Sequence, residues 1–326
     1  MPALIDRQVE LFEAQGYLVV EDLIDVAGYL DPMVEEYEEL LDRLAQRLFA
    51  EGKLSSPHAD LPFGKRLTQL YAETGQVHAQ YFDFSLPFKN VQPDTRCHFG
   101  PAVFDILRNP ALLDVAESLI GPEVYSNPVQ HVRLKPPERL TPRDPKTGRV
   151  MLGATQWHQD ASVVVEDADE TEMLTVWIPI FDATEENGCL CVVPRNHQVG
   201  LLQHCVSGEK GNYLPDKYFD VDRAIPVPIR RGGALFMHRT TPHCSLSNNS
   251  DDVRWSMDLR YNPIGQPTGR PEFPGFVARS RGNPESELRD PVAWEAAWLA
   301  TRARMAAHPE LIGAFYRWKE GAPGCA

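Results

Sequence analysis

The sequence predicts a mainly β chain with flanking helices, in which short strands form a jelly roll or a barrel. From about Glu123 the spacing of apolar residues changes from a helical period to the alternation that strands show. Turn signals such as Gly232-Gly233 and Asn248-Asn249 separate the short apolar runs that follow. Many short strands of even spacing are typical of jelly rolls and barrels, and they disfavour a parallel sheet.

Helical patterns precede these strands. Residues 5–15 predict a short amphipathic helix, and the phrase YLVVED predicts a strand directly after it. Residues 30–51 predict a long acidic helix with a solvated outer face. Its apolar residues at helical spacing are Leu30, Met33, Tyr37, Leu40, Leu41 and Leu44. Asn109, Pro110 and Gly121 predict the N-cap, first turn and C-cap of a further helix.

Short strands are expected from residue 123 onward, and two helices after them. The strand candidates are residues 124–135, 151–160, 172–181, 188–194, 224–229, 233–238, 243–248 and 254–262. A loop rich in Pro, Gly and Arg is expected over residues 263–291. Helices are expected over residues 290–307 and 308–319.

Length and composition indicate a globular protein with a large core. The chain has 326 residues, of which 43% are hydrophobic and 24% are charged. We expect one domain over the whole chain. Its parts would be a helical N-terminal part (1–122), a jelly-roll core (123–262) and a C-terminal loop with helices (263–326).

Charge and composition also exclude several partners. The net charge of −14 disfavours nucleic acid, which binds basic surfaces. No apolar run approaches the roughly eighteen residues that span a membrane, and the start has no secretion signal, so we expect a cytoplasmic protein. The six cysteines form no CxxC pair, and we expect reduced thiols.

His158, Asp160 and His243 are the residues best suited to bind a metal ion. In a strand, residues i and i+2 point to the same side, so the near pair could reach one ion. Two imidazoles and one carboxylate bind Fe(II) on one face and leave the opposite face open. A second pair, His58 and Asp60, lies in a Pro- and Gly-punctuated loop, and we expect no metal there.

Arg254 is expected to bind a dicarboxylate co-substrate. Its guanidinium can grip a carboxylate in bidentate fashion and cannot lose its charge. On the strand over residues 254–262, Arg254, Asp258 and Arg260 share a face that is predicted to look into the barrel. We expect Asp258 and Arg260 to pair with each other.

Six phrases occur in a specific order between about Tyr125 and Tyr261. They are VRLKPP, WHQD, TVWIPI, ENGCLCVVPRNH, GGALFMHRTTPHCS and DDVRWS. Together they resemble the phytanoyl-CoA dioxygenase family. The resemblance implies a catalytic domain with a double-stranded β-helix (jelly-roll, cupin-like) core. It also implies that Fe(II), 2-oxoglutarate and O2 are used to hydroxylate an unactivated C–H bond, with succinate and CO2 as co-products.

The resemblance also implies roles for individual residues. The three metal candidates would be the iron ligands, namely His158, Asp160 and His243. Arg254 would bind the distal carboxylate of 2-oxoglutarate, and Ser245 would hydrogen-bond the same group. Trp177 would line the co-substrate pocket, and His131 would face it. Arg96 would replace a basic residue that the family uses nearby.

The remaining histidines are expected to be structural. His238 is the alternative distal ligand, because it closes a strand five residues before His243. The positions of Ser245 and Arg254 favour His243. We expect His197 to order a turn, and the histidines at positions 98 and 204 lie outside any motif.

Other functions stay open at this point. They are an acyl-CoA 2-hydroxylase of the same family, a cupin-like metalloenzyme without 2-oxoglutarate, and a non-catalytic binding protein. Arg254 and Ser245 disfavour the second, and the intact metal triad disfavours the third. The acidic composition favours a free, neutral or cationic small-molecule substrate over a CoA thioester. The oligomeric state is left open.

Overall fold

The computed structural model describes residues 4–87, 90–208, 210–311 and 317–325. Its α-helices are α1 (Asp6–Gln15), α2 (Asp31–Ala50), α3 (Phe63–Thr74), α4 (Ala79–Phe82), α5 (Pro101–Leu107), α6 (Pro110–Ile120) and α7 (Pro291–Ala307). Its strands are β1 (Tyr17–Val20), β2 (Glu123–Ser126), β3 (His131–Lys135), β4 (Leu174–Pro179), β5 (Leu190–Val192), β6 (Cys205–Ser207), β7 (Gly211–Tyr213), β8 (Ile225–Val227), β9 (Ala234–His238), β10 (His243–Ser245), β11 (Arg254–Pro263) and β12 (Phe276–Ser280). The helices contain more residues than the strands, so the chain is mixed α and β rather than mainly β.

The described strands form a large antiparallel sheet, a small antiparallel sheet and a separate pair. A seven-stranded sheet has the order β1-β9-β4-β11-β2-β12, and β3 pairs with β11 beside this path. A three-stranded sheet has the order β10-β5-β8, and β6 and β7 form a separate pair. Trp177 and Met237 of the large sheet pack with Val192 and Val227 of the small sheet in one apolar cluster. The inner faces of the two sheets therefore lie against each other.

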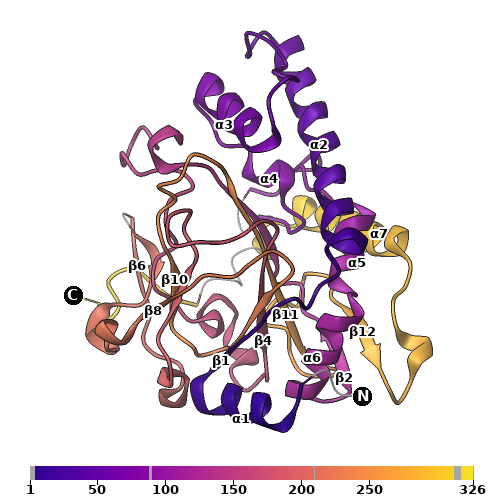
Figure 1. Cartoon of the computed structure of the whole chain (residues 1–326), viewed down its shortest axis with the longest axis vertical. Coiled ribbons are helices and arrows are strands. Elements are labelled where there is room, and N and C mark those ends of the chain that lie inside the picture. Colours follow the sequence, from indigo (N-terminus) through magenta and orange to yellow (C-terminus); the bar gives the residue numbers. More distant parts are fainter. Residues whose placement is uncertain (1–3, 88–89, 209, 312–316, 326) are drawn as a thin grey trace.

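The outer face of the large sheet is covered by helices. Strand β11 alternates: Trp255, Met257 and Leu259 are buried in the largest hydrophobic cluster, which also contains side chains from α2, α5, α6 and α7. Figure 1 shows α5, α6 and α7 beside β2 and β12, and α2, α3 and α4 above the sheets. This packing leaves the alternate residues of β11 facing the space between the sheets.

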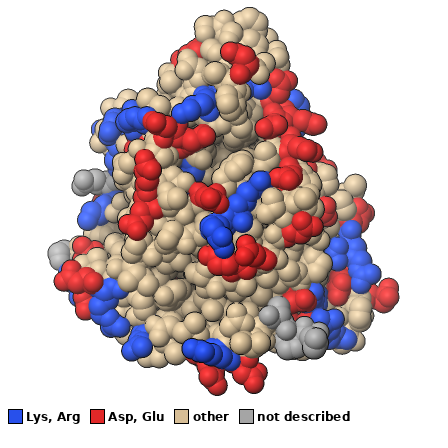
Figure 2. Space-filling view, viewed as in Figure 1, with Lys and Arg blue, Asp and Glu red and all other residues tan. Residues whose placement is uncertain are grey.

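The predicted N-terminal helices are present. The predictions for residues 5–15, 30–51 and the helix after Asn109 correspond to α1, α2 and α6. Asn109 caps α6, since its Oδ1 accepts hydrogen bonds from the backbone N–H groups of Ala111 at 3.0 Å and Leu112 at 3.1 Å. Figure 2 shows acidic side chains along the edge that α2 forms, as a solvated acidic face predicts.

Three expectations about the elements differ from the structure. Helices α3, α4 and α5 were not predicted, because their apolar residues follow Pro and Gly signals that resemble a loop. Strand β12 lies inside the loop expected over residues 263–291. Residues 151–160 form no strand, and His158 makes only an isolated bridge to His243. The partner strand β10 is only three residues long, which limits the pairing.

The C-terminal part also departs from expectation. Cys205 and Cys325 form a disulfide, so the prediction of six reduced thiols is wrong. The helix predicted over residues 308–319 falls partly on residues 312–316, which lie outside the described residues, and residues 317–319 are not helical. None of the described helices is long and apolar enough to cross a membrane.

Candidate metal centre

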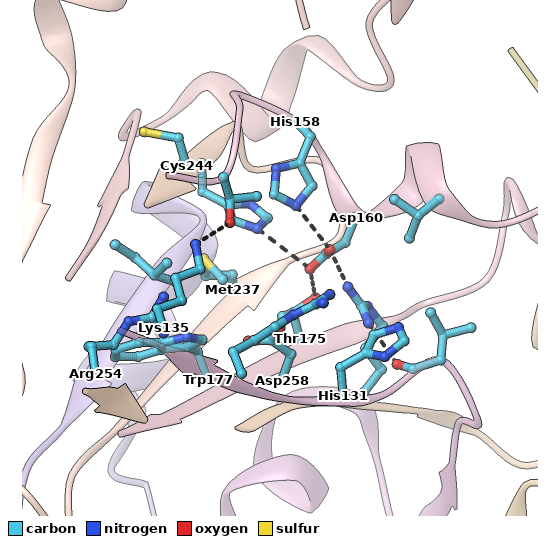
Figure 3. Close-up of a pocket in the computed structure, with 17 residues that line it drawn as sticks. His131, Lys135, His158, Asp160, Thr175, Trp177, Met237, Cys244, Arg254 and Asp258 are labelled. Atoms are coloured by element: carbon cyan, nitrogen blue, oxygen red, sulfur yellow. Dashed lines mark hydrogen bonds and ion pairs between the residues drawn. The ribbon is translucent and has the colours of Figure 1, made fainter. Parts of the chain in front are cut away.

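His158, Asp160 and His243 come together between the two sheets. His158 and His243 exchange backbone hydrogen bonds of 3.0 and 2.9 Å, which fixes the two chain segments side by side. One nitrogen of each ring and one carboxylate oxygen all lie within 4.8 Å of one another. Figure 3 shows the His158 ring pointing toward Asp160, and the Nε2 atoms of His158 and His243 each lie 3.9 Å from an oxygen of Asp160. Three ligand atoms at this spacing could hold one metal ion.

Backbone carbonyls orient both imidazole rings. The Nδ1 atom of His158 lies 2.8 Å from the carbonyl oxygen of Gln156, and that of His243 lies 3.0 Å from the carbonyl oxygen of Thr241. A carbonyl only accepts, so Nδ1 carries the proton and the Nε2 lone pair faces the site. Burial, with a contribution from His243, lowers the pKa of His158 to about 3, so this ring is neutral and able to coordinate a metal.

Both oxygens of Asp160 are hydrogen-bonded. Oδ1 accepts from the guanidinium of Arg260, and Oδ2 accepts from the hydroxyl of Thr175. Burial raises the pKa of Asp160, but Arg260 and the two histidines outweigh this effect and hold the pKa below its usual value. The side chain is therefore a charged carboxylate with a fixed orientation.

This arrangement corrects the expected pairing on β11. Arg260 bonds Asp160 and the carbonyl of Val129 rather than Asp258. Asp258 instead accepts a hydrogen bond from Arg133 at 3.1 Å. Arg254, Asp258 and Arg260 do share a face of β11 that lines the cavity between the sheets, as the alternation of strand residues predicts. The sequence could not reveal the partners, because they lie in segments far from β11 along the chain.

Gln159, between the two near ligands, anchors their segment. Its side-chain amide donates to the carbonyls of Gly200 at 2.9 Å and Thr240 at 2.7 Å, and its Oε1 accepts from the N–H of Leu202 at 2.8 Å. Its own backbone N–H donates to Nε2 of His204 at 3.0 Å. His204 belongs to no motif, so its supporting role was missed.

Two buried cations lie beside the triad. Arg254 and Lys135 are only 3% and 6% exposed, and neither forms an ion pair with a carboxylate among the described residues. Burial lowers the pKa of Lys135 well below its usual value, and the charge of Arg254 adds to this. Burial likewise lowers the pKa of Arg254 to about 10. A bound anion would compensate both charges.

Several predicted residues surround these cations. The Arg254 guanidinium carbon lies 5.5 Å from the ring centroid of Trp177. Lys135 donates to the hydroxyls of Ser245 and Thr155, each at 2.7 Å. Lys135 was not predicted as a site residue. The available signal was its place in the phrase VRLKPP, directly before two prolines.

Two neighbouring cavities open onto this site. A cavity of about 130 Å³ is lined by the triad, Arg254 and Trp177. A second cavity of about 660 Å³ shares four lining residues with it, namely His131, Arg133, Lys135 and Thr155. His131 bonds Asp83 at 2.8 Å, and Figure 3 shows it at the opposite end of the smaller cavity from Arg254.

His238 and His58 contact residues outside the triad. His238 contacts the hydroxyl of Thr240 at 2.8 Å, and its ring lies 5.3 Å from that of His197 at an angle of 57°. His58 lies 2.7 Å from Glu73 in an ion-pair geometry. Arg96 is exposed and lines neither cavity. The structure therefore does not bring these residues to the site.

The geometry defines a class of protein, namely one with a candidate metal site and two buried basic side chains beside it, between two antiparallel sheets. The chain belongs to the phytanoyl-CoA dioxygenase (PhyH) family, whose sequence profile matches residues 12–256. This confirms the resemblance inferred from the six phrases.

Individual proteins agree with this assignment. Phytanoyl-CoA dioxygenase domain-containing protein 1 of Danio rerio is 25% identical over 269 residues, which cover 78% of this chain and 88% of that protein. The solved structure of apo ThoJ, a non-heme monooxygenase, has a TM-score of 0.56 at 17% identity and covers 94% of this chain and 99% of its own. The epimerase SnoN in complex with Fe3+, alpha ketoglutarate and nogalamycin RO has a TM-score of 0.50 at 20% identity, with 82% and 88% covered. These structures share the fold.

Proposed function

We propose that this protein is a non-haem Fe(II)- and 2-oxoglutarate-dependent dioxygenase that hydroxylates an unactivated C–H bond of a small-molecule metabolite. The observation that carries the proposal is the His158, Asp160 and His243 triad beside the buried cations Arg254 and Lys135. Iron and 2-oxoglutarate, when bound, supply the oxidising chemistry with O2, and succinate and CO2 are the co-products.

The metal-binding role follows from the protonation of the three ligands. His158 and His243 present Nε2 lone pairs, because Nδ1 donates to a backbone carbonyl in each case. Asp160 supplies the one negative charge, and its two hydrogen bonds fix its rotation. Two imidazoles and a carboxylate on one side suit Fe(II) and leave positions free on the other.

Binding of 2-oxoglutarate is assigned to the cation pair. Arg254 would grip the distal carboxylate through its guanidinium, with Lys135 and Ser245 completing the polar contacts. Trp177 would shield this end from water, since its ring lies against Arg254. A cupin-like metalloenzyme without 2-oxoglutarate has no need for two buried basic side chains at this position that form no ion pair among the described residues.

The substrate is assigned to the larger cavity. Its volume of about 660 Å³ suits a small molecule, and it shares His131 and Arg133 with the metal cavity. His131 lies at the end away from Arg254, so we assign it to the substrate side rather than to the co-substrate. A free metabolite is favoured over an acyl-CoA.

The same proposal extends to the architecture. The two facing antiparallel sheets are consistent with a double-stranded β-helix, that is, a jelly-roll core of the cupin-like kind. A single catalytic domain is supported by the largest hydrophobic cluster, which contains side chains from Leu4 to Met305. The helical part would then support the metal-bearing core directly.

The test is succinate formation from 2-oxoglutarate in the presence of Fe(II) and O2. The wild-type chain should release succinate, whereas His158→Ala and His243→Ala should bind no iron and release none, because two remaining ligands hold Fe(II) poorly. His58→Ala is the matched control and should keep full turnover. Normal turnover in either triad variant would remove the proposed metal centre.

A further inference from the structure

The C-terminal segment, residues 317–325, lies against the metal-ligand segment although the family profile ends at residue 256. Trp318 donates its indole N–H to the carbonyl of Ser162 at 2.8 Å. Ser162 belongs to the short 3-10 helix that begins at Asp160, and Val163 of the same turn lines the metal cavity. A single hydrogen bond thus links the C-terminal segment to the turn that carries a proposed ligand.

Trp318 also contacts the other support of the ligand segment. Its ring lies 5.3 Å from the ring of His204, at an angle of 34°. His204 is fully buried, its Nδ1 lies 2.9 Å from the carbonyl oxygen of Leu202, and its Nε2 accepts the backbone N–H of Gln159. The indole therefore supports the ligand segment at two points, directly at Ser162, after Asp160, and through His204 at Gln159, between the two near ligands.

Both ends of the segment are fixed to the rest of the chain. Arg317 forms a two-point ion pair with Asp169. At the far end, the disulfide joins Cys325 to Cys205, which directly follows His204, across a sequence separation of 120. Figure 1 shows the C-terminus beside β6, where Cys205 lies. These anchors limit how far Trp318 can move from the ligand turn.

We propose that residues 317–325 are a positioning element for the metal-ligand segment. Trp318 holds the turn after Asp160 and the His204 ring in place, so that the ligand atoms stay at coordinating distance. The disulfide and the Arg317–Asp169 pair hold Trp318. This inference rests on the proposed metal centre, and it assigns a role to a segment outside the region that defines the family.

The test compares Co(II) binding by Trp318→Phe and by a matched control, without 2-oxoglutarate. Trp318→Phe keeps an aromatic ring and removes the N–H donor. We expect about tenfold weaker Co(II) binding and a changed visible spectrum of bound Co(II), as for the loss of other supporting contacts. Trp294→Phe is the control, because the buried Trp294 indole nitrogen has no hydrogen-bond partner among the described residues. It should bind Co(II) like the wild type.

Amide hydrogen exchange is a second measurement, and it distinguishes failure of the positioning role from failure of the proposed metal centre. In the metal-free protein, amide hydrogen exchange over residues 157–163 should be faster in Trp318→Phe and in Cys325→Ser than in the wild type. Unchanged exchange, or Co(II) affinity equal in Trp318→Phe and Trp294→Phe, overturns the positioning role. If the wild-type chain binds no Co(II), the proposed metal centre fails, and the exchange rates alone decide whether the segment orders the ligand turn.

Discussion

Arg254 carries a buried charge that forms no ion pair with a carboxylate in the part of the chain that the structure describes. Its guanidinium bonds the hydroxyl of Ser256 and lies against Trp177, and its Nε atom has no hydrogen-bond partner among the described residues. Keeping such a group buried costs free energy unless an anion binds there. This burial supports the proposal that a carboxylate binds to Arg254.

Arg254→Ala should weaken 2-oxoglutarate binding far more than metal binding. Loss of a charge-assisted contact in a dry pocket costs about 2–5 kcal/mol. Titration of 2-oxoglutarate at saturating Fe(II) measures the effect. Arg139→Ala is a suitable control, because Arg139 is exposed and lines neither cavity. An unchanged affinity in Arg254→Ala would assign the carboxylate contact elsewhere.

Single residues of the site were predictable where their spacing repeats a strong pattern. His158, Asp160, His243 and Arg254 were found in this way, and they do lie together. Lys135 was missed because its role depends on which strands meet across the site. Local patterns in the sequence carry no information about such distant neighbours.

Among the elements, helix α6 shows how well end signals define a helix. It begins after Asn109 and ends before Gly121, whose φ of 91° favours glycine. Asn109→Ala should lower the free energy of unfolding by about 0.5–2 kcal/mol, because two backbone N–H groups lose their acceptor. Chemical denaturation measures it, with Asn283→Ala as control, since the Asn283 side chain makes no cap hydrogen bond. Equal stability would show that water replaces the cap.

Elements without such signals could not be predicted. Helix α3 follows the loop SSPHADLP and has no side-chain cap hydrogen bond, so its N-terminus carries no local capping signal. Its buried residues include Leu67, Leu70 and Tyr71, which join the main hydrophobic cluster. Tertiary burial therefore determines this helix, and a local pattern does not show it.

For the whole molecule, the negative net charge matches the acidic surface along α2 but not the charges that line the metal cavity. The chain has a net charge of −14, and Figure 2 shows acidic side chains along α2. The smaller cavity is nevertheless lined by four cationic side chains and two carboxylates. The cations are Arg133, Lys135, Arg254 and Arg260, and the carboxylates are Asp160 and Asp258. Composition thus predicts poorly which ligands the interior accepts.

The charge of the whole chain also leads to a prediction about the substrate, namely that it is a free metabolite rather than an acyl-CoA. A CoA group carries several phosphate charges and needs a cluster of Lys and Arg outside the cavity. We expect free acids or amines to stimulate 2-oxoglutarate turnover and matching acyl-CoAs not to do so. Succinate release with paired compounds measures this. Stimulation by acyl-CoAs alone would make the protein an acyl-CoA hydroxylase.

Strand β11 places Arg254 near one end and Arg260 near the other, six residues apart on one face. At about 3.3 Å per residue, the backbone positions of Arg254, the proposed co-substrate contact, and Arg260, which donates to Asp160, lie roughly 20 Å apart along the strand. Inserting one residue between them would turn one of the two arginines into the hydrophobic core while the other kept its place. The strand thus fixes the spacing of the two arginines, and a change of its length between them removes one arginine from the shared face even though neither residue is substituted.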